Sequence, residues 1–432
     1  MEEILDLAKR VADHAEVFHV VSIRSPVLFE ANRLKQIQSK ETSGTALRLI
    51  KDGRIGFAQA SGNIPPGELV EMALETCPLG QQAIFELPGL QSYADVEIFD
   101  PAVDKISIDD MIQAGQILID KVLAHTPDLL CEASLSKSIV SCQIANTLGC
   151  YAKFSKSSYG AGLEGMLVRD SDILYVGDSQ GSCRPVIDFQ AIADEVIRQL
   201  ELARRNVSIT SGMLPVVFTP LGVAGSLLSP LLSALNGKTV FDGASPLKDK
   251  LGQKMLDSQF TFWDDPSIPY QPGSTPFDDE GIPAQKNALI KDGVINRFYY
   301  DLHTAALAGA TSTGNGSRNG GMPSPSPHQL VVKGGETSPA SMIEDIKEGI
   351  VIEMLMGAEQ GNILNGDFSG NVLLGYKIEN GQVTGRVKDT MIHANVYDLL
   401  KEIVAVGNDA RWIGGSVRIP SICCPAVSIS AK

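Results

Sequence analysis

The apolar residues of this chain follow two spacings, one typical of helices and one typical of strands. Apolar residues at i, i+3, i+4 and i+7 predict a first helix over residues 2–15. Alternating or continuous apolar runs predict strands over most of residues 16–60 and 129–178. Further helices are predicted at residues 66–76, 107–125, 188–205, 221–235, 245–256, 338–349 and 396–403.

Tight turns are marked by three residue pairs that lie between predicted strands. These pairs are Asp52-Gly53, Asp292-Gly293 and Asn380-Gly381. An Asp-Gly pair suits a type I′ hairpin turn, because both central residues of that turn need a positive φ. Helices mixed with antiparallel strands indicate an α+β fold rather than a regular βαβ series.

A long segment without charged residues divides the chain. Residues 206–237 contain no Asp, Glu, Lys or Arg, and a segment of this length could span a bilayer. However, Pro215 and Pro220 enclose a short strand pattern, so a buried strand followed by a buried helix explains the segment better. We therefore predict two domains. Residues 1–205 form an α/β sandwich with a mixed or antiparallel sheet, and residues 206–432 form an antiparallel β-rich domain with a few helices.

Composition and charge narrow the classes of function. The 36 basic and 51 acidic residues give a formal charge of −15, which argues against a nucleic-acid partner. The seven cysteines form no CxxC pattern, so we interpret them as reduced and buried. The start, Met1-Glu2-Glu3, lacks the basic and apolar parts of a signal peptide. We therefore expect a cytoplasmic protein with no membrane segment.

The familiar catalytic and nucleotide-binding motifs are missing from the sequence. None of the six histidines is followed by Glu, so HExxH and HExxxH are both absent. GxGxxG after a strand, GxxxxGK[ST] and GxSxG are absent as well. A zinc site built from distant ligands, and a Ser–His or Cys–His pair assembled in space, both remain open.

The strongest local signal is an acidic loop at Phe277–Pro283. Its three adjacent carboxylates repel one another, so they need backbone N–H donors, a cation or the amino group of a peptide. The alternative is a solvated acidic turn. A second signal is the segment Ser312–Arg318, whose glycines permit close approach of the backbone and whose Arg318 could hold a carboxylate. The alternative there is a flexible loop tip.

Together with later motifs, these two segments form an ordered series. The motifs are FDDEGIP (277–283), KDG (291–293), STGNGSR (312–318), GDFS (366–369), IENG (378–381), VGND (406–409) and GGSV (414–417). The series resembles the TldD/PmbA family, often described as modulators of DNA gyrase. The resemblance covers residues 205–432 well, and the N-terminal half matches in length and element order.

The resemblance implies a cytoplasmic proteolytic system of two related subunits. The TldD type carries HExxxH on a helix and a later Cys as a third zinc ligand, whereas the PmbA type, also called TldE, lacks the motif. In this chain the corresponding helix, residues 227–237, has no His or Glu, and Gly414 stands at the place that resembles the cysteine. The chain therefore resembles the PmbA/TldE type. We expect no cofactor in this chain and zinc in its TldD-type partner.

Three hypotheses of function follow. The first is a non-catalytic subunit of a two-protein metallopeptidase that processes peptides and unfolded small proteins, paired with a TldD-type subunit or forming a homodimer through its C-terminal half. The others are a self-sufficient peptidase with an unrecognised site, and a non-proteolytic regulator of gyrase or toxin–antitoxin proteins. No catalytic or metal residue is assigned. The candidate substrate-binding residues are Asp278, Asp279, Glu280, Gly281, Asn315 and Arg318.

Overall fold

The structure is a computed structural model that describes residues 1–170, 172–358 and 361–432. Its first sheet has seven strands in the order β4-β3-β1-β5-β6-β7, and β2 pairs with β1. All of these pairings are antiparallel, as predicted for the N-terminal half. The strands are β1 (His14–Glu30), β2 (Arg33–Ile37), β3 (Lys40–Lys51), β4 (Arg54–Ser61), β5 (Leu130–Asn146), β6 (Tyr151–Arg169) and β7 (Asp172–Ser182).

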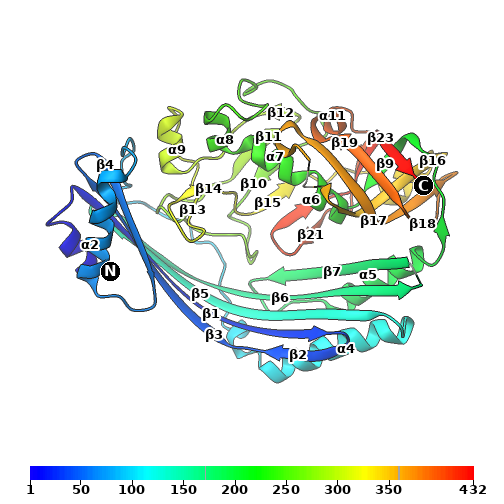
Figure 1. Ribbon diagram of the computed structural model, residues 1–432, viewed down its shortest axis with the longest axis horizontal. Coiled ribbons are helices and arrows are strands. Elements are labelled where there is room, and N and C mark those ends of the chain that lie inside the picture. The colour runs from blue at the N-terminus through cyan, green and yellow to red at the C-terminus, as the bar shows by residue number, and fades with distance from the viewer. Residues whose placement is uncertain (171, 359–360) are drawn as a thin grey trace.

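Helices cover one face of this sheet and one of its ends (Figure 1). On the face, α4 and α5 bury Leu118 and Val196 in a cluster with Leu163 of the sheet. Helix α4 begins with a capping box formed by Ser107 and Asp110. At the end, α2 packs on β4. The helices are α1 (Glu2–Ala8), α2 (Pro66–Thr76), α3 (Ala102–Lys105), α4 (Ile108–His125) and α5 (Phe189–Leu202), with a 3-10 turn, η1, at Cys77–Leu79.

The predicted first helix, residues 2–15, is too long. The helix α1 ends at Ala8 and β1 begins at His14. Ala15 is paired with Leu49 of β3, and the Asp13 N–H donates to the Ile50 carbonyl at 2.8 Å. Pairing with β3 thus overrides the helical spacing of the apolar residues.

The three predicted turns are confirmed. Asp52, Asp292 and Asn380 have φ values of 50°, 49° and 49°, and the glycine after each also has a positive φ. These angles place both central residues in the left-handed region that a type I′ turn requires. The turns join β3 to β4, β11 to β12 and β17 to β18.

The C-terminal half contains a closed barrel and a six-stranded sheet. The barrel runs β16-β9-β23-β19-β17 and closes because β17 also pairs with β16, while β18 and β8 extend it. The other sheet has the order β12-β11-β10-β15-β22-β21. Most pairings are antiparallel, as predicted, but β9–β16, β15–β22 and β8–β18 are parallel. The strands are β8 (Asn206–Val207), β9 (Gly212–Phe218), β10 (Phe262–Asp264), β11 (Asn287–Lys291), β12 (Val294–Ile295), β13 (Gly316–Ser317), β14 (Ser324–Pro325), β15 (Leu330–Val332), β16 (Glu348–Met356), β17 (Asp367–Glu379), β18 (Gln382–Val387), β19 (Thr390–Asn395), β20 (Ala405–Val406), β21 (Arg411–Ile413), β22 (Val417–Ile419) and β23 (Ile422–Ala431).

Several predicted helices of this half differ from the observed ones. Residues 221–235 form two buried helices, α6 and α7, rather than one. Residues 245–256 form turns, because Gly252 has a φ of +77°, a left-handed conformation that an α-helix does not contain. Helix α10 ends before Gly349, which lies in β16. The helices are α6 (Pro220–Ser226), α7 (Leu228–Leu235), α8 (Gly237–Phe241), α9 (Leu302–Leu307), α10 (Pro339–Ile343) and α11 (Val396–Lys401), with a 3-10 turn, η3, at Ile363–Asn365.

The two halves share one apolar cluster. Tyr376 and Ile378 of β17 and Cys423 of β23 are buried in the same cluster as Leu118 of α4 and Val196 of α5. The long N-terminal sheet runs along one side of the C-terminal half (Figure 1). Its strands end at Ser182, and the strands from Asn206 onward belong to the other sheets. The division into domains 1–205 and 206–432 stays a prediction. Among the described helices, none has the length and apolar character needed to cross a membrane.

Candidate functional site

The acidic loop is folded around the side chain of Asp278. One carboxylate oxygen, Oδ1, accepts hydrogen bonds from the N–H groups of Glu280 and Ile282, both at 2.9 Å. The other oxygen accepts from the Gly316 N–H at 2.8 Å. Burial, together with the neighbouring Glu280, holds the pKa of Asp278 well above its usual range. The loop therefore uses backbone N–H donors, one of the three solutions that its sequence allowed.

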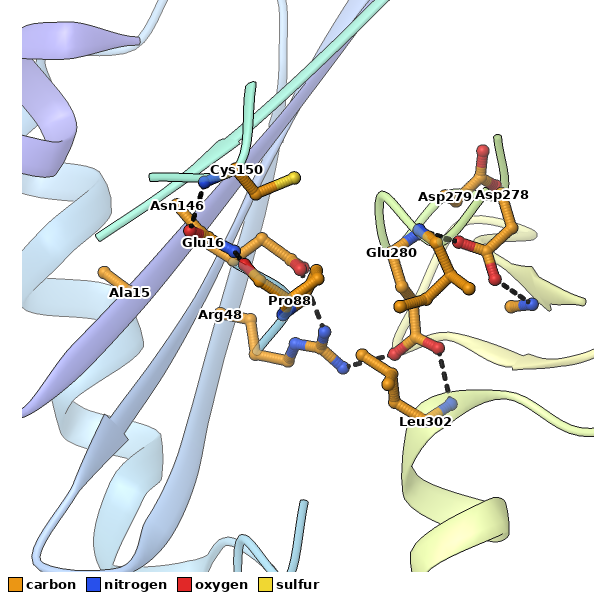
Figure 2. A network of polar contacts seen from close by, with 12 residues as sticks. Ala15, Glu16, Arg48, Pro88, Asn146, Cys150, Asp278, Asp279, Glu280 and Leu302 are labelled. Carbon is orange, nitrogen blue, oxygen red and sulfur yellow. Dashed lines mark hydrogen bonds and ion pairs between the residues drawn. The ribbon is translucent and has the colours of Figure 1, made fainter. Parts of the chain in front are cut away.

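From this loop, a chain of alternating charges crosses to the N-terminal sheet. Arg48 of β3 donates to Glu280 Oε1 at 2.7 Å and to Glu16 Oε2 of β1 at 3.0 Å, as Figure 2 shows. The other oxygen of Glu16 accepts from Arg318. Arg318 also donates from its backbone to Asp279 Oδ2 at 2.7 Å and from Nε to the Asp279 carbonyl at 3.0 Å. We call Glu16, Arg48, Asp279, Glu280 and Arg318 the charge network.

The charge network is almost completely buried. The side chains of Arg48, Glu16 and Glu280 are 1%, 0% and 0% exposed. Burial alone would lower the pKa of Arg48, but the two glutamates more than offset this and raise it above its ordinary value. Removing one partner of such a pair leaves an uncompensated charge in a low-dielectric interior. The network therefore fastens the sheet to the C-terminal loops.

Helix α9 and its cap complete one end of the network. The second oxygen of Glu280 accepts from the Leu302 N–H at 2.7 Å, in the first turn of that helix. Asp301 caps the helix by accepting from the Thr304 N–H at 2.7 Å. Burial, and then the negative charge of Glu280, raises the pKa of Asp301 to about 6. Asp301 therefore titrates in a range that a pH experiment can reach.

Asn315 connects the second predicted loop to the six-stranded sheet. Its Nδ2 donates to Asp264 Oδ2 at 2.6 Å and to the Ser326 carbonyl at 3.0 Å. Its Oδ1 accepts from Thr313 Oγ1 at 2.8 Å and from Asn287 Nδ2 at 3.2 Å. Asn315 is fully buried, so its amide fixes the path of three segments of the chain.

The structure brings all six predicted residues into one region. Asp279 and Arg318 are in direct contact, Asp278 and Gly316 join the two loops, and Gly281 has a φ of +76° that favours glycine. The interpretations as a solvated acidic turn and as a flexible tip are wrong, because Asp278, Glu280 and Asn315 are buried. A role in substrate binding stays a prediction.

Sequence reasoning missed the two charged residues that the sheet contributes. Glu16 lies between Ala15 and Val17, and Arg48 lies between Leu47 and Leu49. All four of these neighbours are fully buried. A charge inside an apolar strand is costly unless a partner lies across the interface. This interruption of an apolar run was the signal that could have indicated a buried ion pair.

Residues 227–237, for which the resemblance implied the counterpart of a zinc-binding helix, form α7 and the start of α8. Leu228, Leu231, Ala234 and Leu235 of α7 are buried in the C-terminal core. A helix with this side-chain set packs but offers no metal ligand. Gly414 follows β21, has a φ of +57° and lies against Gly181 of the N-terminal sheet.

Comparison with known proteins decides the family. Residues 211–431 match the model of the PmbA/TldA metallopeptidase C-terminal domain, and residues 15–76 match that of the PmbA/TldA metallopeptidase domain 1. This chain belongs to the PmbA/TldD family. The structure of TldE from Thermococcus kodakarensis is similar to it, with a TM-score of 0.92 and 25% identity over all of both chains.

Two curated relatives match nearly the full length of this PmbA/TldD-family chain. An uncharacterized protein of Methanocaldococcus jannaschii is 25% identical, with 96% of each chain covered. A metalloprotease of Methanothermobacter thermautotrophicus is 27% identical, with 94% of this chain and 90% of the relative covered. The name of the second relative and the description of the matching domain models support a function of the peptidase type.

The family description implies a metal, and the residues present do not fit a zinc site. Helix α7 supplies no imidazole, thiolate or carboxylate. Within residues 1–170, 172–358 and 361–432, no group of three or more His, Cys, Asp or Glu side chains is arranged to hold a metal ion. The described cysteines are buried, and burial raises the pKa of the Cys423 thiol to about 11.

Proposed function

We propose that this chain is the non-zinc subunit of a two-component peptidase that acts on peptides and unfolded small proteins. The observation that carries the proposal is helix α7, which has the buried leucine face of a packing element in place of metal ligands. The structural similarity to TldE supports it. In this account a TldD-type relative with HExxxH supplies the zinc, and this chain supplies walls and polar surfaces for the substrate.

For the charge network we propose a positioning role. Glu16, Arg48 and Glu280 are too buried to contact a substrate in this arrangement. They fix the angle between the N-terminal sheet and the C-terminal half, and so the shape of any space between them. The candidate substrate-binding residues Asp278 and Arg318 would act on a substrate through this geometry.

The experiment that tests the proposal mixes this chain with an HExxxH-bearing relative from the same organism. Hydrolysis of an unfolded, dye-quenched casein is measured for each protein alone and for the mixture. We expect the mixture to be active and this chain alone to be inactive, and we expect the two to elute together in size-exclusion chromatography. Activity of this chain alone at the level of the mixture would contradict the proposal, as would a mixture no more active than the relative.

A matched variant separates assembly from chemistry. In the relative, replacing the Glu of HExxxH by Gln is expected to abolish activity of the mixture without changing its elution. If the mixture stays active, the chemistry resides in this chain, and the self-sufficient peptidase becomes the better account.

A further inference from the structure

A groove of about 820 Å³ lies between the N-terminal sheet and the C-terminal half. One wall is apolar and comes from the C-terminal half, where the half-buried side chains of Leu221, Met354, Leu373 and Ile413 line it. The floor is the face of strands β1, β5, β6 and β7 opposite to helices α4 and α5, since Phe29, Ala133 and Leu163 point the other way into the helix-covered core.

Strand register shows that the floor is built from rows of small residues. In one row Leu28, Ser134, Gly162 and Ser179 are consecutive partners across the four strands. In the next row the partners are Pro26, Ser136, Gly160 and Gly181. A second hollow of about 440 Å³ continues the groove over this row. Because the side chains of these rows are small, space remains between the sheet and the C-terminal half, and a bound molecule could fill it.

The groove ends at a row of acidic residues. Glu132 of β5 and Glu164 of β6 are direct cross-strand partners, and both line the groove. Like charges directly opposite each other on a sheet are destabilising. Two other acidic residues that line the groove have cation partners: Glu30 is paired with Lys35 at 3.0 Å, and Asp178 is paired with Arg411 at 2.7 Å. Glu132 and Glu164 form no ion pair with any residue of the described part of the chain.

The edge of the sheet beside the groove is closed to strand addition. The Gln199 side chain accepts from the Gly177 N–H at 2.8 Å and donates to its carbonyl at 3.0 Å. Arg386 donates to the Ile173 carbonyl at 2.7 Å. These contacts occupy backbone groups of β7 that a peptide strand would need. An occupant must therefore lie across the floor rather than extend the sheet.

From this geometry we propose that the groove binds an extended peptide segment whose Lys or Arg side chains pair with Glu132 and Glu164. Four strands about 4.8 Å apart span roughly 14 Å, which is the length of about four extended residues. The apolar wall contacts the rest of the segment, and the small floor residues let its backbone approach. This inference rests on the proposed function, because it names the substrate class that the subunit would hold.

Peptide binding to the isolated chain tests the inference. The probes are two fluorescein-labelled eight-residue alanine peptides, one with two central lysines and one with two central glutamates, measured by fluorescence anisotropy at low salt. The first variant, Glu132→Gln/Glu164→Gln, removes both carboxylate charges from the groove and is called the groove pair. The second, Ser134→Trp, fills the groove with a large side chain. The control pair, Glu68→Gln/Glu71→Gln, makes the same charge change at exposed positions of α2.

We expect the wild type to prefer the lysine peptide and the groove pair to bind it about fivefold to tenfold more weakly. The Ser134→Trp variant should no longer bind the lysine peptide, and the control pair should bind it as tightly as the wild type does. Equal binding of both peptides, an unchanged affinity in the groove pair, or the same loss in the control pair would each overturn the inference. Because this assay uses neither zinc nor the relative, its failure leaves the subunit role standing. Conversely, activity of this chain alone would end the subunit role without touching the binding result.

Discussion

The charge network and the groove place the same kinds of side chain in opposite situations. In the network, Arg48 lies between Glu16 and Glu280, and all three are buried. In the groove, Glu132 and Glu164 are exposed cross-strand partners, and neither forms an ion pair within the described part of the chain. A compensated buried charge holds parts of a fold together. A pair of exposed like charges without a cation partner lowers the stability of the fold slightly, and both charges can still bind a ligand.

The strongest way to break this comparison is to remove the cation at the centre of the network. Arg48→Leu leaves Glu16 and Glu280 buried without their shared partner, so we expect a loss of about 3–5 kcal/mol in the free energy of unfolding. Guanidinium titration measures it. The exposed Arg10→Leu serves as control and should change stability by less than about 0.5 kcal/mol. A loss as small as that for Arg48→Leu would mean that the network does not fasten the two halves.

The pH dependence of stability also tests the charge network, through Asp301 beside Glu280. The pKa of Asp301 is raised to about 6 from its ordinary 3.8, so the folded state holds its proton more tightly than the unfolded state. Its contribution is fully present below about pH 4 and is lost as the pH rises through about 6. This loss amounts to about 2–3 kcal/mol.

Asp301→Asn keeps the cap of α9 without the titration. Between pH 4 and pH 7, the free energy of unfolding of the variant should therefore rise relative to that of the wild type. Denaturant titration at each pH measures this difference. Parallel pH profiles for the two proteins would contradict the assignment.

A smaller effect is expected at the closed edge beside the groove. Gln199→Ala leaves the Gly177 N–H and carbonyl without their partner, at a cost of about 1–3 kcal/mol. The bare edge should also self-associate, since unpaired strand edges template pairing. Analytical ultracentrifugation and thermal unfolding measure both effects. The exposed Gln190→Ala is the control. A monomeric variant of unchanged stability would show that the edge needs no cover.

The smallest effect is expected in the groove, and its sign is opposite. Glu132→Gln/Glu164→Gln removes a like-charge pair and should stabilise the fold by about 0.2–1 kcal/mol. Thermal unfolding at low salt measures the gain, which should shrink in 0.5 M NaCl because exposed charges are screened. A destabilised variant would mean that the two carboxylates hold the fold together, and the contrast with the network would disappear.

Local patterns predicted the elements that depend on local chemistry. The turns at Asp52-Gly53 and Asn380-Gly381 need only a few neighbouring residues, and the structure has them. The first helix was wrong because β3, about 35 residues away in the chain, competes for Ala15 through strand pairing. Spacing along one segment carries no information about such a partner.

The candidate site was predictable to a similar extent. The loop containing Asp278 and the loop containing Arg318 were found, because clustered carboxylates and glycines are visible in the sequence. Their partners Glu16 and Arg48 were missed, since they lie more than 200 residues from Glu280 in the chain, and the sheet alone brings them close. The groove also escaped notice, because its floor depends on the register of four strands.

The central claim is that this chain contributes no zinc centre to the peptidase in which it takes part. The most direct test is the zinc content of the chain, purified without added metal or chelator and measured by atomic emission against protein concentration. The account predicts a value near zero per chain. A value near one zinc per chain would contradict it, and would mean that distant residues build a metal site in this subunit itself.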